Sequence, residues 1–138
     1  MGALACGGAQ ASPFTLGAAG GLGVAFGGPL DWTAAASLGL RDPAWPVGAR
    51  LAARRGPLGL SLDVAGLYWL DERSGSTYLG GGLGLQPAGG AILGELVFGF
   101  AWTLTPALAW TLEANADVPL DGAPAAFSVL TGAAYRIP

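Results

Sequence analysis

Large apolar residues alternate with small or polar residues along most of this chain. In the segment from Leu108 to Val118, one face carries Leu, Trp, Leu, Ala, Ala and Val, and the other carries Ala, Thr, Glu, Asn and Asp. The segments from Leu58 to Leu70 and from Ile92 to Leu104 repeat the arrangement, and Tyr78 to Gln86 shows it most weakly, with mostly Gly opposite Leu. A period of two residues sends successive side chains to opposite faces of a β-strand. The pattern therefore predicts a series of two-faced strands.

Clusters of Gly, Pro and Asp, which typically end strands, interrupt this alternation at nearly regular spacing. The breaks lie at residues 27–29, 42–45, 56–57, 71–76, 87–90, 105–106 and 121–124, and they define eight segments. The segments are about 10 to 14 residues long, and a tilted strand needs roughly 9 to 11 residues to cross a bilayer. The uncharged stretch 74–94 would also suit a transmembrane helix. Against helices, Glu113, Asn115 and Asp117 share one face of a strand, whereas a helix would turn Asn115 toward lipid.

The small or polar face of the strands indicates whether the large apolar side chains point into the barrel or out of it. Soluble barrels place their large residues inside, and membrane barrels place them outside. Here the second face is mostly Gly, Ala, Ser and Thr, and only 11% of the chain is charged. Small residues suit the interior of an eight-stranded barrel, which is only just wide enough for side chains. We therefore predict an all-β fold, a transmembrane antiparallel up-and-down barrel of about eight strands formed by residues 12–138.

Aromatic residues near the segment ends support an outward-facing apolar surface. Such residues form girdles at the two membrane interfaces of transmembrane barrels. The predicted girdle consists of Trp32, Tyr68, Trp102, Phe127 and Tyr135.

From Phe14 to Ile137 this pattern resembles the small outer-membrane barrels of the OmpA/OmpX and OmpW type. Such families usually end on an aromatic strand, and the segment from Phe127 to Tyr135 is similar to it, although three residues follow Tyr135 and the last is Pro138. The resemblance implies a location in the bacterial outer membrane, with membrane lipids and other envelope proteins as partners. It also implies that both termini lie on the periplasmic side, so that the connection at 71–76 would be periplasmic too.

The first eleven residues form a separate region. Residues 9–11 read Ala-Gln-Ala and resemble a signal-peptide cleavage site, although a charged start and most of an apolar core are missing. Three interpretations remain open: a truncated or misassigned start that leaves the remnant of a signal peptide, a disordered tail, and a leader lipidated at Cys6. Cys6 is the only cysteine and the chain has no histidine, so neither an internal disulfide nor a conventional zinc site is expected, and no cofactor is predicted.

Charged residues on the small-residue face are predicted to form an ion network inside the barrel, because charges in a narrow lumen must be paired or hydrated. Its members are Arg50, Arg54, Asp63, Glu95, Glu113 and Asp117, with Asp31, Arg41 and Arg136 nearer the ends. A tight turn centred on Gly56 and Pro57 predicts that Arg50 pairs across the hairpin with Asp63 and Arg54 with Gly59. A turn of odd length at Thr105 and Pro106 brings Glu95 near Asp117, where the two acids would repel unless an arginine intervenes or one stays protonated.

These features favour a structural or accessory role in the cell envelope, either alone or within a larger membrane assembly. The alternative is a narrow channel for ions or small solutes, with a lumen along Gly80, Gly82 and Gly84. An enzyme is not expected, because Ser61 and Ser128 have no histidine to act as a base. The net charge of −3 argues against nucleic acid as a partner.

Overall fold

A computed structural model describes the whole chain apart from residues 1–12, 43–44, 71–74 and 138. The predicted leader therefore lies outside the described residues, and so does much of the connection at 71–76. The described residues contain no helix that could span a membrane. They form eight antiparallel strands of 10 to 12 residues. These strands are β1 (Phe14–Ala25), β2 (Leu30–Leu40), β3 (Val47–Gly56), β4 (Gly59–Trp69), β5 (Gly75–Leu85), β6 (Ile92–Thr103), β7 (Leu108–Pro119) and β8 (Ala126–Arg136).

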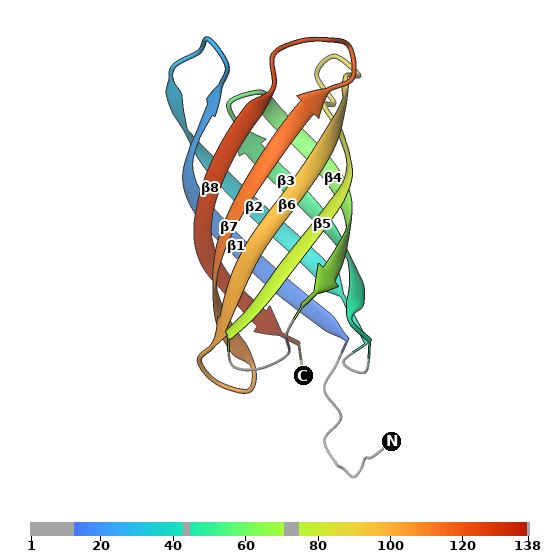
Figure 1. Ribbon diagram of the computed structural model, residues 1–138, viewed down its shortest axis with the longest axis vertical. Coiled ribbons are helices and arrows are strands. Elements are labelled where there is room, and N and C mark those ends of the chain that lie inside the picture. Colours follow the sequence, from blue (N-terminus) through green and yellow to red (C-terminus); the bar gives the residue numbers. More distant parts are fainter. Residues whose placement is uncertain (1–12, 43–44, 71–74, 138) are drawn as a thin grey trace.

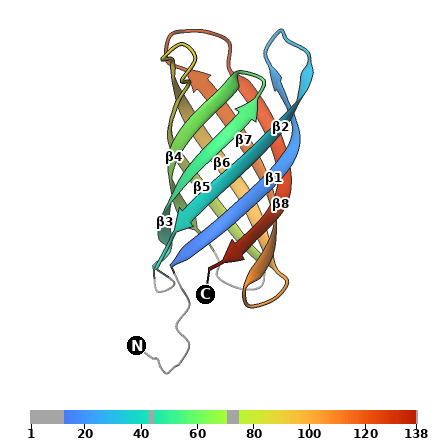
Figure 2. The same ribbon diagram turned by 180° about the vertical axis from the view of Figure 1, so that it is seen from behind.

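The strands pair in sequence order and close into a barrel, which confirms the predicted architecture (Figure 1). Closure is made by β1, which pairs with β2 on one side and β8 on the other (Figure 2). The β1–β8 ladder runs from Thr15 opposite Arg136 to Ala25 opposite Ala126, so it extends along nearly the whole of both strands. Closure removes the sheet edges, and no row of backbone N–H and C=O groups is left without partners.

The first residues of β1 and the last residues of β8 lie at the same end of the barrel, where β2, β4 and β6 also end (Figure 1). We call this the terminal end. The turns β1–β2, β3–β4, β5–β6 and β7–β8 lie at the opposite end, which we call the turn end. Four of the turn-end glycines, Gly27, Gly59, Gly90 and Gly122, have φ between +70° and +98°, a conformation that other residues rarely adopt. The predicted breaks therefore coincide with chain reversals, except that Gly75 and Ser76 already belong to β5.

The two faces of the strands differ as the alternation predicts. Among the described residues, thirty large apolar or aromatic side chains are 38% exposed or more, and most of them lie on the outer face of the strands, as Leu62, Leu83 and Phe98 do. Within the eight strands, Arg55 is the one charged residue that the alternation places outward. An almost uncharged belt of large apolar side chains around a closed barrel is the surface that a hydrocarbon environment requires.

Inward-facing glycines allow the wall to bend and the interior side chains to fit. A Cβ atom on Gly82 in β5 would overlap the carbonyl oxygen of Val64 in β4 and lie 2.6 Å from the Cα of Ala65. Gly66, on the outer face of β4, has no such neighbour within 4 Å. Glycines at these inward positions therefore serve close backbone approach, as is common where barrel strands curve.

We expect Gly82→Ala to destabilise the folded barrel by about 2–3 kcal/mol, because the new methyl group meets backbone atoms that cannot move independently. Gly66→Ala is the matched control on the neighbouring strand and is expected to change stability by less than about 1 kcal/mol. Reversible urea unfolding in detergent micelles measures both. Equal stabilities for the two variants would show that the wall tolerates a side chain at Gly82.

Candidate functional site: the barrel lumen

Two arginines of β3 reach across the lumen to acids of β7, on the opposite wall. Arg50 donates from Nη1 and Nη2 to the two carboxylate oxygens of Glu113, at 2.6 and 3.1 Å. Arg54 donates in the same bidentate way to Asp117, at 2.8 and 2.7 Å. Bidentate guanidinium–carboxylate pairs are among the strongest and most directional hydrogen bonds in proteins. These two pairs therefore tie opposite sides of the barrel together.

Arg54 also binds two further acids. Its Nε lies 3.0 Å from Asp63 Oδ2, and its Nη2 lies 3.3 Å from Glu95 Oε2. Arg54 and its three acidic partners are each at least 95% buried. Glu95 stands directly opposite Asp117 in the β6–β7 ladder, as the odd-length turn at Thr105 and Pro106 predicts. An arginine does lie between these two acids, and it is Arg54.

The predicted pairing of Arg50 with Asp63 is wrong. In the β3–β4 ladder Arg50 faces Ala65, Asp63 faces Ala52, and Arg54 faces Ser61 rather than Gly59. The reason is the turn, which is formed by Pro57 and Leu58 between the paired Gly56 and Gly59, instead of being centred on Gly56 and Pro57. Pro57 suits the first central position of a turn, and Gly59 accepts the positive φ that follows it.

That error moves each partner along the strand by two residues, which is one full period of the pleat. Arg50, Arg54 and Asp63 therefore still face inward, although their neighbours across the hairpin differ. The structure brings all six predicted network residues into the lumen, as two connected groups around Arg50 and Arg54.

Tyr78 and Asn115 complete the network around Glu113, and neither was among the predicted members. The Tyr78 hydroxyl donates to Glu113 Oε1 at 2.7 Å, and Asn115 Nδ2 donates to Oε2 at 3.0 Å. A Cβ atom on Gly99 would overlap the Tyr78 ring, so this glycine makes room for the tyrosine to reach the acid. Tyr78 shares the inward register of Gly80, Gly82 and Gly84, and that parity is the signal that could have identified it.

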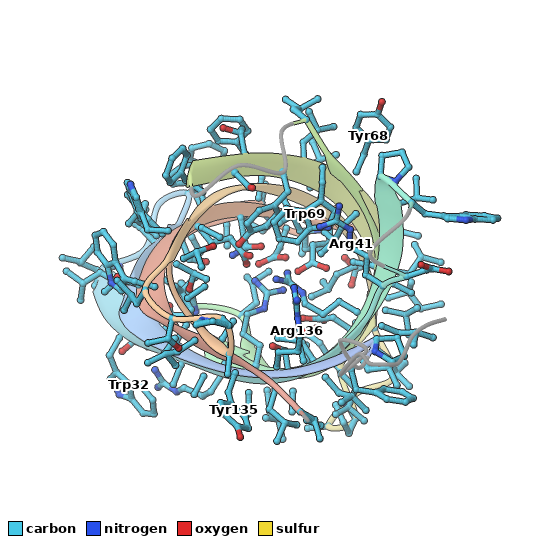
Figure 3. The ribbon with its side chains drawn as sticks, turned by 90° about the horizontal axis from the view of Figure 1, so that it is seen from below. Trp32, Arg41, Tyr68, Trp69, Tyr135 and Arg136 are labelled. Carbon is cyan, nitrogen blue, oxygen red and sulfur yellow. The ribbon has the colours of Figure 1, made fainter. Side chains whose placement is uncertain are left out.

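Charged residues predicted near the barrel ends behave differently from one another. Arg41 and Arg136 point into the lumen at the terminal end (Figure 3). The Arg41 guanidinium lies 4.8 Å from the ring centre of Trp69, another inward side chain. Asp31 instead forms an ion pair with the outward-facing Arg55 at 3.1 Å, with both side chains 37% exposed, so it belongs to the rim at the turn end.

The predicted girdle residues lie on the outer surface. Trp32, Tyr68 and Tyr135 project away from the barrel (Figure 3), and these three side chains and that of Phe127 are 44–55% exposed. Trp102 is more covered, because it stacks on Trp110 with ring centres 4.4 Å apart. Tyr68, Trp102 and Tyr135 belong to the terminal end, and Trp32 and Phe127 to the turn end.

The lumen is open on one side of the network and closed on the other. A cavity of about 570 Å³ extends from Pro13, Arg41 and Arg136 at the terminal end to Arg54 and Glu95. Beyond the network, five inward side chains are buried and do not line the cavity. They are Thr33, Ser61, Leu93, Ala126 and Ser128, each 1–3% exposed. The space along the predicted glycine wall is also occupied, because Leu67 lies against Gly80 and Asp63 against Gly84.

The chemistry of the lumen is that of ion pairing. Among the described residues, no group of three or more His, Cys, Asp or Glu side chains has the geometry to hold a metal ion. Four carboxylates surround two guanidinium groups: Arg50 pairs with Glu113, and Arg54 pairs with the other three acids. Removing one arginine would leave buried negative charge without a partner.

Comparisons with known proteins agree with the architecture. No protein-family model matches the sequence, and no curated protein matches it significantly. The crystal structure of neisserial surface protein A (NspA) superimposes with a TM-score of 0.72 and 14% sequence identity, covering 94% of this chain and all of that one. A structure from the de novo design of transmembrane β-barrels superimposes with a TM-score of 0.69 and 12% identity, covering 94% of this chain and 98% of the other. The fold is therefore that of the eight-stranded transmembrane β-barrels.

We expect Arg54→Ala to lower the free energy of unfolding by about 3–5 kcal/mol, because the buried carboxylates of Asp63, Glu95 and Asp117 lose their positively charged partner. Arg55→Ala is the matched control on the next residue, where a half-exposed ion pair contributes about 1 kcal/mol or less. Urea unfolding in micelles measures the two variants side by side. A small effect at Arg54 would mean that the network is hydrated and does not stiffen the barrel.

Proposed function

We propose that this chain is an integral protein of the bacterial outer membrane with a structural or accessory role in the cell envelope. The observation that carries the proposal is the closure of the lumen by the Arg54 cluster, because a closed barrel with short turns offers a stable membrane element rather than a solute path. The outer belt of apolar side chains and the aromatic residues near both ends support insertion into lipid.

The partners follow from the two kinds of surface. Membrane lipids cover the apolar belt, and other envelope proteins are the proposed partners of an accessory subunit. The described connections at the turn end are short; the one between β3 and β4, for example, has two residues between paired glycines. Short turns argue against adhesion or receptor binding, which need extended loops. A catalytic role is not part of the proposal, because the chain contains no histidine and its buried acids are engaged with arginines.

The membrane proposal predicts that the protein, extracted from native membranes in mild detergent, runs as a compact band unless it is boiled. Closed barrels resist unfolding by detergent because every strand is paired on both sides. Gel migration of unboiled and boiled samples, together with separation of inner and outer membranes, is the measurement. Recovery in the soluble fraction without a heat-dependent shift would overturn the proposal, and a much larger unboiled species would identify an assembly.

A narrow channel is the competing function, and the cavity that enters from the terminal end is the feature that favours it. We expect no steady single-channel current from the purified protein in a planar lipid bilayer, because the side chains beyond Arg54 leave no continuous path. The opposite result would be a current that changes with Asp63→Asn or Glu113→Gln. That result would assign the lumen to conduction and exclude a purely structural role.

A further inference from the structure

Charge inside the lumen is divided between the closed and the open part. In the closed part, Arg54 faces the three carboxylates of Asp63, Glu95 and Asp117, for a formal charge of −2. Nearer the terminal end, the charged residues that line the cavity are Arg41, Arg50, Arg136 and Glu113, for a formal charge of +2. Arg54, Asp63 and Glu95 line its inner end, so the cavity lining as a whole has a formal charge of +1. An electrostatic field of this kind attracts anions into the open part and repels them from the closed part.

The two sides of the cavity also differ in the size of the side chains that line them. One side, formed by β4, β5 and β6, carries a packed cluster of Leu67, Tyr78 and Val97, against which Trp69 rests. The rings of Trp69 and Tyr78 are 4.5 Å apart and form a continuous aromatic surface. The facing side consists mainly of small residues, among them Gly17, Ala19, Ser37, Ala52, Ala109 and Ala134. These small side chains leave space in front of an apolar wall.

Arg136 is the basic group best placed to receive a ligand at the entrance. Arg136 is the last residue of β8, and its side chain extends into the lumen (Figure 3). The residue is exposed, and the structure gives it no ion pair with a described residue. Its backbone is held in place, because its N–H donates to the carbonyl of Ala107 at 2.7 Å.

We propose that this cavity binds a single-chain amphiphilic anion, with the acidic head group at Arg136 and the apolar chain along Leu67 and Trp69. Its volume of about 570 Å³ falls in the range of about 300–1,000 Å³ typical of small-molecule sites. A guanidinium group pairs equally well with a carboxylate or a phosphate. The ligand class is therefore a fatty acid or an alkyl phosphate. This site goes beyond the structural role, and it requires no conduction through the closed part.

The test uses the purified full-length barrel, released from a neutral detergent and examined by native mass spectrometry. Decanoate and decyl phosphate probe the two acidic head groups, and decanol is the neutral analogue with the same chain. We expect one equivalent of at least one anion to bind, with an apparent dissociation constant at least about tenfold below that of decanol. The relative affinities of decanoate and decyl phosphate distinguish a fatty acid from a phosphorylated ligand. Equal binding of decanol, or no binding of either anion, would overturn the proposal.

Variants locate the ligand within the barrel. Arg136→Gln is expected to weaken anion binding about tenfold without changing the binding of decanol. Ala109→Trp fills the cavity and is expected to abolish binding, whereas Ala114→Trp, on the outer face of the same strand β7, is expected to leave it unchanged. Anion binding that survives Ala109→Trp would mean adsorption to the outer surface and would overturn the proposal.

Each variant is first checked for the heat-dependent gel shift, so that loss of binding is not confused with loss of the barrel. If Ala109→Trp does not fold, Ala134→Leu replaces it, because it lines the same wall and adds less volume. Loss of the ligand site would leave the gel shift and the absence of current intact. Failure of the proposed site is thereby distinguishable from failure of the proposed membrane role.

Discussion

The narrow interior of an eight-stranded barrel is the constraint on which the rest of this structure depends. Such a barrel has just enough internal width for side chains, so any large inward residue requires small ones around it. The Tyr78 ring occupies the space left by Gly99, and Asp63 lies against Gly84. Glycine on the inner wall is thus the condition for placing arginines and acids there. The outer wall has no such limit and carries the large apolar residues instead.

The second determinant is the pairing of charge inside that space. Arg54 joins β3 to β4, β6 and β7 through its three carboxylate partners, and Arg50 joins β3 to β7 through Glu113. A buried ion pair contributes little net stability compared with apolar packing, but removing one partner is costly. The network therefore fixes how opposite walls face each other, and it places an acidic cluster at the inner end of the cavity, away from the basic residues Arg41 and Arg136 at its entrance. That arrangement gives an otherwise regular barrel two different ends.

This chain shares its fold with known barrels but not its sequence, so its function has to be inferred from individual residues. NspA and a designed transmembrane barrel share this fold at 14% and 12% identity. Barrels of this kind need alternation, strand length and turn chemistry, which many sequences satisfy. What distinguishes this chain is the set of groups in its lumen, with Arg54 at the closed end and Trp69 and Arg136 near the open one. The proposed role rests on those residues rather than on the fold.

The sequence by itself determined the number of strands, the two faces and the inward set of charged residues, because each depends on a local period of two. It also predicted Glu95 beside Asp117, since a turn of odd length at Thr105 and Pro106 keeps the inward faces of the two strands aligned. Tertiary structure alone decided the partners of Arg50 and Arg54. Glu113 and Asp117 are 63 residues away from them, on a strand that never pairs with β3. Such contacts arise only when the sheet closes, because closure brings opposite walls within reach of a guanidinium group. The alternation of residues along the chain does not indicate the distance between β3 and β7 across the lumen.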